Sequence, residues 1–213
     1  MEAAPEQHWY ALKVFFNKVF ELEGLLEDMG LETFLAVDKV RLKGPAYTLA
    51  RKHIAEKEEK GKADRRYIQE GPILLQRIPM VSSLLFVKAF PDELPPLDTF
   101  LHQEFGKIKG YIYKKTDGLT YSAIPDKQMT AFRMVTAKGS EGLIFFSDQP
   151  AIPYKKGEKV RVKDGPLKGL EGYVLRIRRD RRLLVKLEGI IAVTTTHIPP
   201  ESLESVTEED SAQ

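Results

Sequence analysis

The stretch GEKVRVKDGPLKGLEGYV, residues 157–174, decides the fold of the C-terminal part of the chain. Val160 and Val162 alternate with charged residues, which indicates a half-buried strand. Gly165-Pro166 follows them and indicates a tight turn. This order of strand and turn predicts the first part of an antiparallel β-structure.

The residues after this turn indicate a second, sharply curved strand. Gly169 and Gly172 leave room where a side chain would crowd the backbone, and Val174 continues the apolar pattern. No helical period appears after residue 153, and short apolar runs occupy 159–163, 173–177, 183–187 and 190–197. About fifty residues with this spacing predict a small β-barrel.

The N-terminal part mixes strand and helix patterns. Residues 9–14 and 31–40 are apolar and β-branched, as strands are, and residues 83–90 form a dense apolar run typical of a buried strand. Between the first two, apolar residues from Val19 to Met29 share one helical face, and Gly30 occupies a C-cap position. This alternation predicts an α+β fold with an antiparallel sheet flanked by helices.

The rest of this part predicts two further helices and a hairpin. Residues 97–105 have helical spacing, and residues 110–113 and 121–124 flank an Asp117-Gly118 turn. Pro125-Asp126 then begins a helix through Val135. We assign these elements to an N-terminal domain of residues 1–138.

Two segments interrupt this pattern. Charged residues crowd 44–76, which predicts a solvated loop with one short helix, or alternatively an insertion that contacts nucleic acid or a partner. Residues 139–153 have the composition of a linker, although 143–146 are apolar enough to dock on a domain. The C-terminal β-domain then covers 154–207, and an acidic tail covers 208–213.

Composition excludes several classes of protein. The chain has 213 residues, 42% of them hydrophobic, and its 33 basic and 31 acidic residues give a net charge of +2. It has no cysteine, no nucleotide-binding glycine fingerprint, and four histidines without metal-ligand spacing. No apolar run approaches the ~20 residues that cross a bilayer. We expect a cytoplasmic monomer that is not an enzyme and needs no cofactor or metal.

The glycine-rich stretch resembles the KOW motif of transcription and ribosomal proteins. The matching residues are Val160, Val162, Gly165, Pro166, Gly169, Gly172 and Val174, while Leu167 stands where the family often has phenylalanine. Residues 9–14 with the helix after them, and 110–112 with 124–129, resemble the opening and closing parts of the NusG N-terminal domain. The whole chain is thus similar to NusG-family transcription elongation factors.

One departure refines the resemblance. NusG proteins usually carry Phe-Pro-Gly-Tyr before the central strand, and this chain has Val81-Ser82-Ser83-Leu84. With the insertion, this resembles the UpxY-type paralogues of Bacteroidetes, which implies antitermination in capsular or exopolysaccharide operons. Two alternatives are a general NusG-type elongation factor and a ribosome-associated RNA-binding protein built around KOW.

The resemblance implies a site for RNA polymerase. An apolar depression would receive the clamp helices, lined by Val81, Leu84 and Phe86 with Tyr10 adjacent. The alternative is that these four residues are ordinary core. A factor of this kind favours the elongating state by binding it more tightly than the paused state.

Further contacts are expected on basic and apolar residues. Non-template DNA or nascent RNA would meet Lys107, Lys109, Tyr111, Tyr113, Lys114 and Lys115 near the hairpin, and Arg176, Arg178, Arg179, Arg181 and Arg182 around the barrel turn. The alternative for both groups is a solvated turn. In the KOW domain, Ile190 aligns with the family's contact aromatic and Ile191 lies beside it. They would bind Rho or a ribosomal protein, or they would close the barrel.

Overall fold

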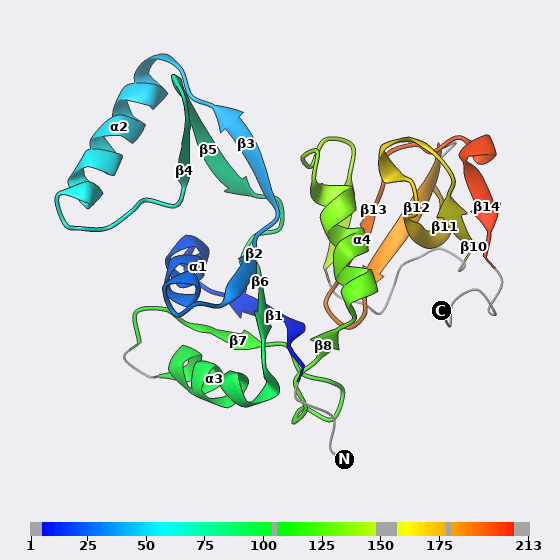
Figure 1. The fold of residues 1–213 in the computed structure, drawn as a ribbon, viewed down its shortest axis with the longest axis horizontal. Coiled ribbons are helices and arrows are strands. Elements are labelled where there is room, and N and C mark those ends of the chain that lie inside the picture. The colour runs from blue at the N-terminus through cyan, green and yellow to red at the C-terminus, as the bar shows by residue number, and fades with distance from the viewer. Residues whose placement is uncertain (1–5, 104–105, 148–156, 178–179, 207–213) are drawn as a thin grey trace. The chain divides into compact units, whose positions relative to one another are not determined.

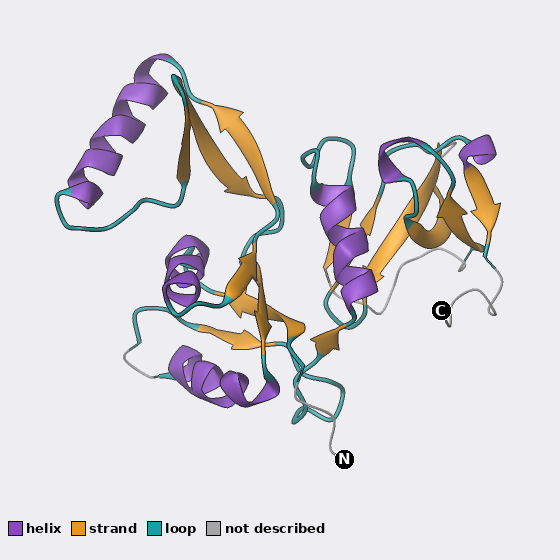
Figure 2. Cartoon of the chain, in the orientation of Figure 1, coloured by secondary structure: helices purple, strands orange, loops and turns teal. Residues whose placement is uncertain are grey.

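The computed structural model describes residues 6–103, 106–147, 157–177 and 180–206. Within these residues the chain is an α+β protein with four α-helices and three antiparallel sheets (Figure 2). Contacts divide it into two compact units. The first comprises residues 1–7 and 12–112, and the second comprises residues 8–11 and 113–213.

The main sheet of the first unit is formed by the apolar runs near residues 10, 33 and 86. Its strand order is β2-β6-β1-β7, with β1 at His8–Val14, β2 at Glu32–Phe34, β6 at Leu84–Ala89 and β7 at Gly110–Ile112. Strand β6 is buried on both faces, as its unbroken apolar sequence predicts. The strands expected at 9–14 and 83–90 are therefore confirmed.

Helices α1 (Val19–Asp28) and α3 (Leu94–His102) belong to the same unit. Helix α1 buries Val19, Leu22 and Leu26, and it ends where Gly30 takes a φ of 84°. Met29, expected on the buried face, is exposed because the helix stops one residue earlier. Helix α3 buries its leucines and contacts β7.

The charged segment 44–76 is more regular than its composition predicts. It holds a 15-residue helix, α2 (Gly44–Glu58), followed by β4 (Tyr67–Glu70) and the start of β5 (Ile73–Pro79), as Figure 1 traces. With β3 (Val37–Arg41) these strands form a sheet of order β3-β5-β4. The expectation of a loop with one short helix is wrong, because good helix formers in α2 compensate for its weak apolar face.

Ion pairs connect the segment that contains this small sheet to α1. Arg77 on β5 donates to both carboxylate oxygens of Glu23 at 2.7 Å, and both side chains are largely buried. Arg65 binds Glu27 and lies against Gly24, where a Cβ would collide with it. The segment is therefore an integral part of the first unit.

The second unit is built around one six-stranded antiparallel sheet. Its order is β14-β10-β11-β12-β13-β9, and its strands are β9 (Ile144–Ser147), β10 (Lys159–Val162), β11 (Glu171–Ile177), β12 (Asp180–Leu187), β13 (Ile191–Thr194) and β14 (Leu203–Ser205). The four apolar runs expected after residue 153 are confirmed as strands. Docking of residues 143–146 is confirmed too, because Ile144 pairs with Thr194 and Phe146 with Ala192.

The segment 113–136 also belongs to the second unit. Lys114 and Tyr121 form a bridge across the Asp117-Gly118 turn, and β8 (Ala123–Ile124) pairs with β1. The helix expected after Pro125 is confirmed as α4 (Asp126–Thr136). It packs against β12, whereas the sequence pattern assigns it to the N-terminal domain. None of the helices in the described residues is long and apolar enough to cross a bilayer.

Candidate functional site

The apolar residues expected to contact polymerase lie mostly in the interior. Leu84 is 4% exposed, Phe86 1% and Tyr10 3%, and only Val81 is partly exposed. Phe86 packs near Phe34, with ring centroids 6.2 Å apart, and burial raises the pKa of Tyr10. The alternative interpretation, ordinary core, fits this burial. Contact of these side chains with a partner would require the structure around them to open.

An exposed aromatic cluster lies at the end of β1 in the first unit. It consists of Phe15, Phe16 and Tyr111, with ring centroids 6.3 Å apart for Phe15–Phe16 and 6.0 Å for Phe15–Tyr111. Phe16 is 76% exposed, whereas Phe15 and Tyr111 are each a little over a third exposed. Grouped aromatic side chains on a surface are typical of interaction sites.

The backbone around the aromatic cluster is strained. Phe16 and Asn17 have φ values of 57° and 55°, and Ser83 has 66°. The left-handed region is unfavourable for non-glycine residues and costs about 1–3 kcal/mol at each. The Val14 N–H donates to the Ser83 carbonyl, and the Phe15 N–H donates to that of Lys109, both at 2.8 Å. These bonds hold the strained turns side by side, and strain of this kind clusters at functional sites.

Only part of the first basic group lies at this cluster. Lys109 is bonded to Phe15 through the backbone, Tyr111 is a member of the cluster, and exposed Lys107 is in the loop before β7. Tyr113, Lys114 and Lys115 belong instead to the hairpin of the second unit, where Lys114 lies 5.2 Å from the Tyr121 ring centroid. The structure therefore divides the predicted nucleic-acid residues between the units.

The glycine-rich stretch folds as its spacing predicts. Val160 and Val162 are buried in β10, Val174 is half-buried in β11, and Gly165 and Gly169 have φ values of 74° and 85°. These two glycines, with Pro166 between them, form the short 3₁₀ turn and its exit.

A Cβ at Gly172 would lie 2.8 Å from the Leu184 carbonyl oxygen on β12. Glycine is required there by close backbone approach.

Ile190 and Ile191 are buried in the second unit. Ile191 begins β13, where it pairs with Leu187 and Ser147, and Ile190 immediately precedes it. Their burial favours the interpretation in which they complete the core. Their contact with Rho or a ribosomal protein stays a prediction.

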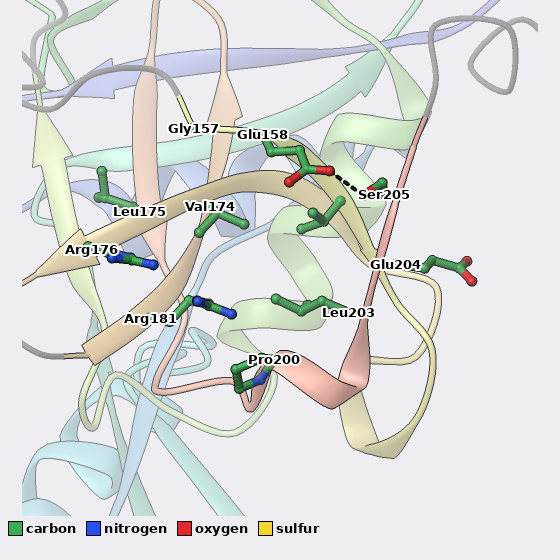
Figure 3. Close-up of a pocket in the computed structure, with 11 residues that line it drawn as sticks. Gly157, Glu158, Val174, Leu175, Arg176, Arg181, Pro200, Leu203, Glu204 and Ser205 are labelled. Atoms are coloured by element: carbon green, nitrogen blue, oxygen red, sulfur yellow. Dashed lines mark hydrogen bonds between the residues drawn. The ribbon is translucent and has the colours of Figure 1, made fainter.

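The arginines around the β11–β12 turn have different environments. Arg176 and Arg181 stand directly opposite each other on neighbouring strands, beside an open cavity (Figure 3). Arg182 donates to the carbonyls of Gly142 and Thr195 and lies 3.7 Å from Asp180. Arg178 and Arg179 lie outside the described residues. Arg176 and Arg181 are therefore available to a ligand, whereas Arg182 stabilises the fold through its own contacts.

Sequence reasoning missed the aromatic cluster. The signal was present in Phe15-Phe16-Asn17, where two aromatic residues precede a helix and Asn tolerates positive φ. Among the described residues, no three His, Asp or Glu side chains lie where they could hold a metal ion. No protein-family model matches the chain, and no curated protein matches it in sequence.

Proposed function

We propose that this chain is a non-catalytic transcription elongation factor of the NusG type that binds RNA polymerase and suppresses pausing or termination. The observation that carries the proposal is the sheet of the second unit. Its strand order β14-β10-β11-β12-β13 is the one that an SH3-like barrel would have. The Gly165-Pro166 turn between β10 and β11 and the close approach of Gly172 to β12 support the resemblance to a KOW motif. The α+β first unit is consistent with a NusG-type N-terminal domain.

The aromatic cluster is the proposed polymerase contact. Phe15, Phe16 and Tyr111 present apolar surface that a pair of clamp helices could cover, and aromatic anchors dominate the energetics of such interfaces. The cluster lies beside the turn that contains Ser83, where the sequence departs from the NusG pattern. The proposed polymerase contact is therefore this exposed surface, and not the buried side chains of Leu84 and Phe86.

The mechanism requires differential binding and no chemistry. A factor that binds the elongating polymerase more tightly than the paused one shifts the equilibrium toward elongation. A difference of about 1.4 kcal/mol changes the ratio of the two states tenfold. Lys107 and Lys109 would bind exposed non-template DNA near the cluster. Such a contact would allow the factor to be recruited to particular operons, such as those for polysaccharide synthesis.

Transcription in vitro tests this proposal. The purified chain, added to bacterial core polymerase halted on a template with a defined pause, should shorten the pause and increase read-through of a terminator. Phe16→Asp should abolish the effect, and Leu49→Asp, which changes an exposed leucine on α2, should retain it. Unchanged pausing at saturating wild-type protein would contradict the proposal. Co-sedimentation with ribosomes alone would then favour the ribosome-associated alternative.

A further inference from the structure

The second unit contains an open cavity beside the β11–β12 hairpin. Its volume is about 570 Å³, and its walls come from β10, β11, β12, β14 and the turn before β14 (Figure 3). This volume lies within the range of cavities that hold small ligands. Val174 and Leu203 give it an apolar floor.

One wall of the cavity carries an uncompensated pair of positive charges. Arg176 and Arg181 are cross-strand partners, a placement in which like charges repel. Neither guanidinium forms an ion pair or hydrogen bond with any other described residue. A bound anion would remove this repulsion, and arginine's planar fork suits the oxygens of a phosphate.

Another wall carries hydrogen-bond acceptors. The Ser205 hydroxyl donates to the Glu158 carboxylate, whereas the Glu204 carboxylate points away from the cavity and lies 3.6 Å from Arg161 (Figure 3). Carboxylates would repel a second phosphate, but they accept hydrogen bonds from hydroxyl groups. The cavity thus offers donors for an anion, acceptors for hydroxyls and an apolar surface between them, as Figure 3 shows for Arg181, Val174 and Glu158.

We propose that this cavity binds one nucleotide of single-stranded RNA. Arg176 and Arg181 hold a backbone phosphate, Glu158 accepts from a ribose hydroxyl, and the base covers Val174 and Leu203. An acidic peptide would satisfy the arginines and be repelled by Glu158, and DNA lacks the 2′-hydroxyl that distinguishes RNA. The sequence predicted that the arginines around this turn contact nucleic acid, and the proposal assigns two of them to one nucleotide. It does not depend on polymerase binding.

Fluorescence anisotropy with the full chain tests the site. The probes are a fluorescein-labelled 12-mer RNA and a DNA of the same sequence, titrated between 50 and 200 mM salt. Arg176→Ala with Arg181→Ala should weaken RNA binding at least tenfold and reduce the salt slope by roughly 0.7, from the loss of one phosphate contact on a single strand. The matched control, Lys163→Ala with Lys168→Ala, removes two exposed charges of the same unit that do not line the cavity, and it should cost less than threefold.

Two further variants separate geometry from charge. Arg176→Lys with Arg181→Lys keeps the charge and loses the fork, so it should bind RNA more weakly than wild type. Glu158→Ala should bring the ratio of RNA to DNA affinity toward one. Failure of wild type to bind RNA at 50 mM salt, or an equal loss in the lysine control, would overturn the proposal. Tighter binding of a labelled poly-glutamate peptide would overturn it as well.

Discussion

At the residue scale, the side chains that determine local structure are mostly not those that suggest function. Asp117 illustrates this, because its carboxylate accepts hydrogen bonds from the N–H groups of Leu119 and Thr120 at 2.8 Å and from the Thr120 hydroxyl at 2.6 Å. The Thr120 hydroxyl and these N–H groups lower the pKa of Asp117 to about 2. The hairpin turn therefore depends on an ionised carboxylate.

The pH dependence of this turn follows from the direction of that shift. A folded-state pKa below the unfolded value of 3.8 means that the contribution is complete above about pH 4 and is lost as the pH falls through about 2. NMR titration of the Asp117 carboxyl should give a midpoint near 2, and Asp117→Asn should loosen residues 114–121 at neutral pH. A midpoint near 4 would show that the hydrogen bonds do not persist in solution.

The Arg77–Glu23 pair should matter more for stability than any surface pair. Arg77→Ala leaves the Glu23 carboxylate buried without its partner, and such a change costs about 3–5 kcal/mol. Urea unfolding followed by tryptophan fluorescence and circular dichroism measures the loss. Arg77→Met combined with Glu23→Leu should recover most of it, whereas an equal loss in the double variant would assign the effect to packing of Arg77 on Phe20.

At the element scale, sequence pattern predicted strands better than it predicted α2. Buried strands such as β6 and β13 consist of continuous apolar runs. Such strands can be predicted from their own sequence, without knowing which strands lie beside them. Helix α2 buries only Ala50 among its residues, so it lacks the periodic signal that identifies a helix. The helix depends on the helix propensity of its residues and on the small sheet, whose strand β3 precedes it in the chain and whose strands β4 and β5 follow it.

The close packing of β11 against β12 provides a prediction at this scale. Gly172→Ala places a methyl group 2.8 Å from the Leu184 carbonyl oxygen, so β11 and β12 must separate locally. We expect a loss of about 1–3 kcal/mol in the stability of the second unit, the usual cost of overpacking. Hydrogen exchange of β11 and β12 amides should show the effect there. Unchanged exchange would contradict the requirement for glycine.

At the scale of the whole molecule, the sequence indicated where strands lie along the chain but not which surfaces are free. The residues expected to bind polymerase are apolar, and apolar residues fill cores as readily as they line interfaces. Only three-dimensional packing shows that Leu84 and Phe86 are enclosed and that Phe16 is exposed. In the same way, the cavity at Arg176 and Arg181 depends on pairing between strands, which residue spacing alone does not specify.

The affinity of the chain for bacterial core RNA polymerase tests the central claim most directly. Phe16→Asp is a suitable variant, because Asp tolerates the left-handed backbone at this position better than Phe and the side chain is exposed. Interferometry should give wild type and Leu49→Asp the same dissociation constant and Phe16→Asp one at least tenfold higher. Equal binding by all three would remove the aromatic cluster as the contact, and no binding by wild type would contradict the account.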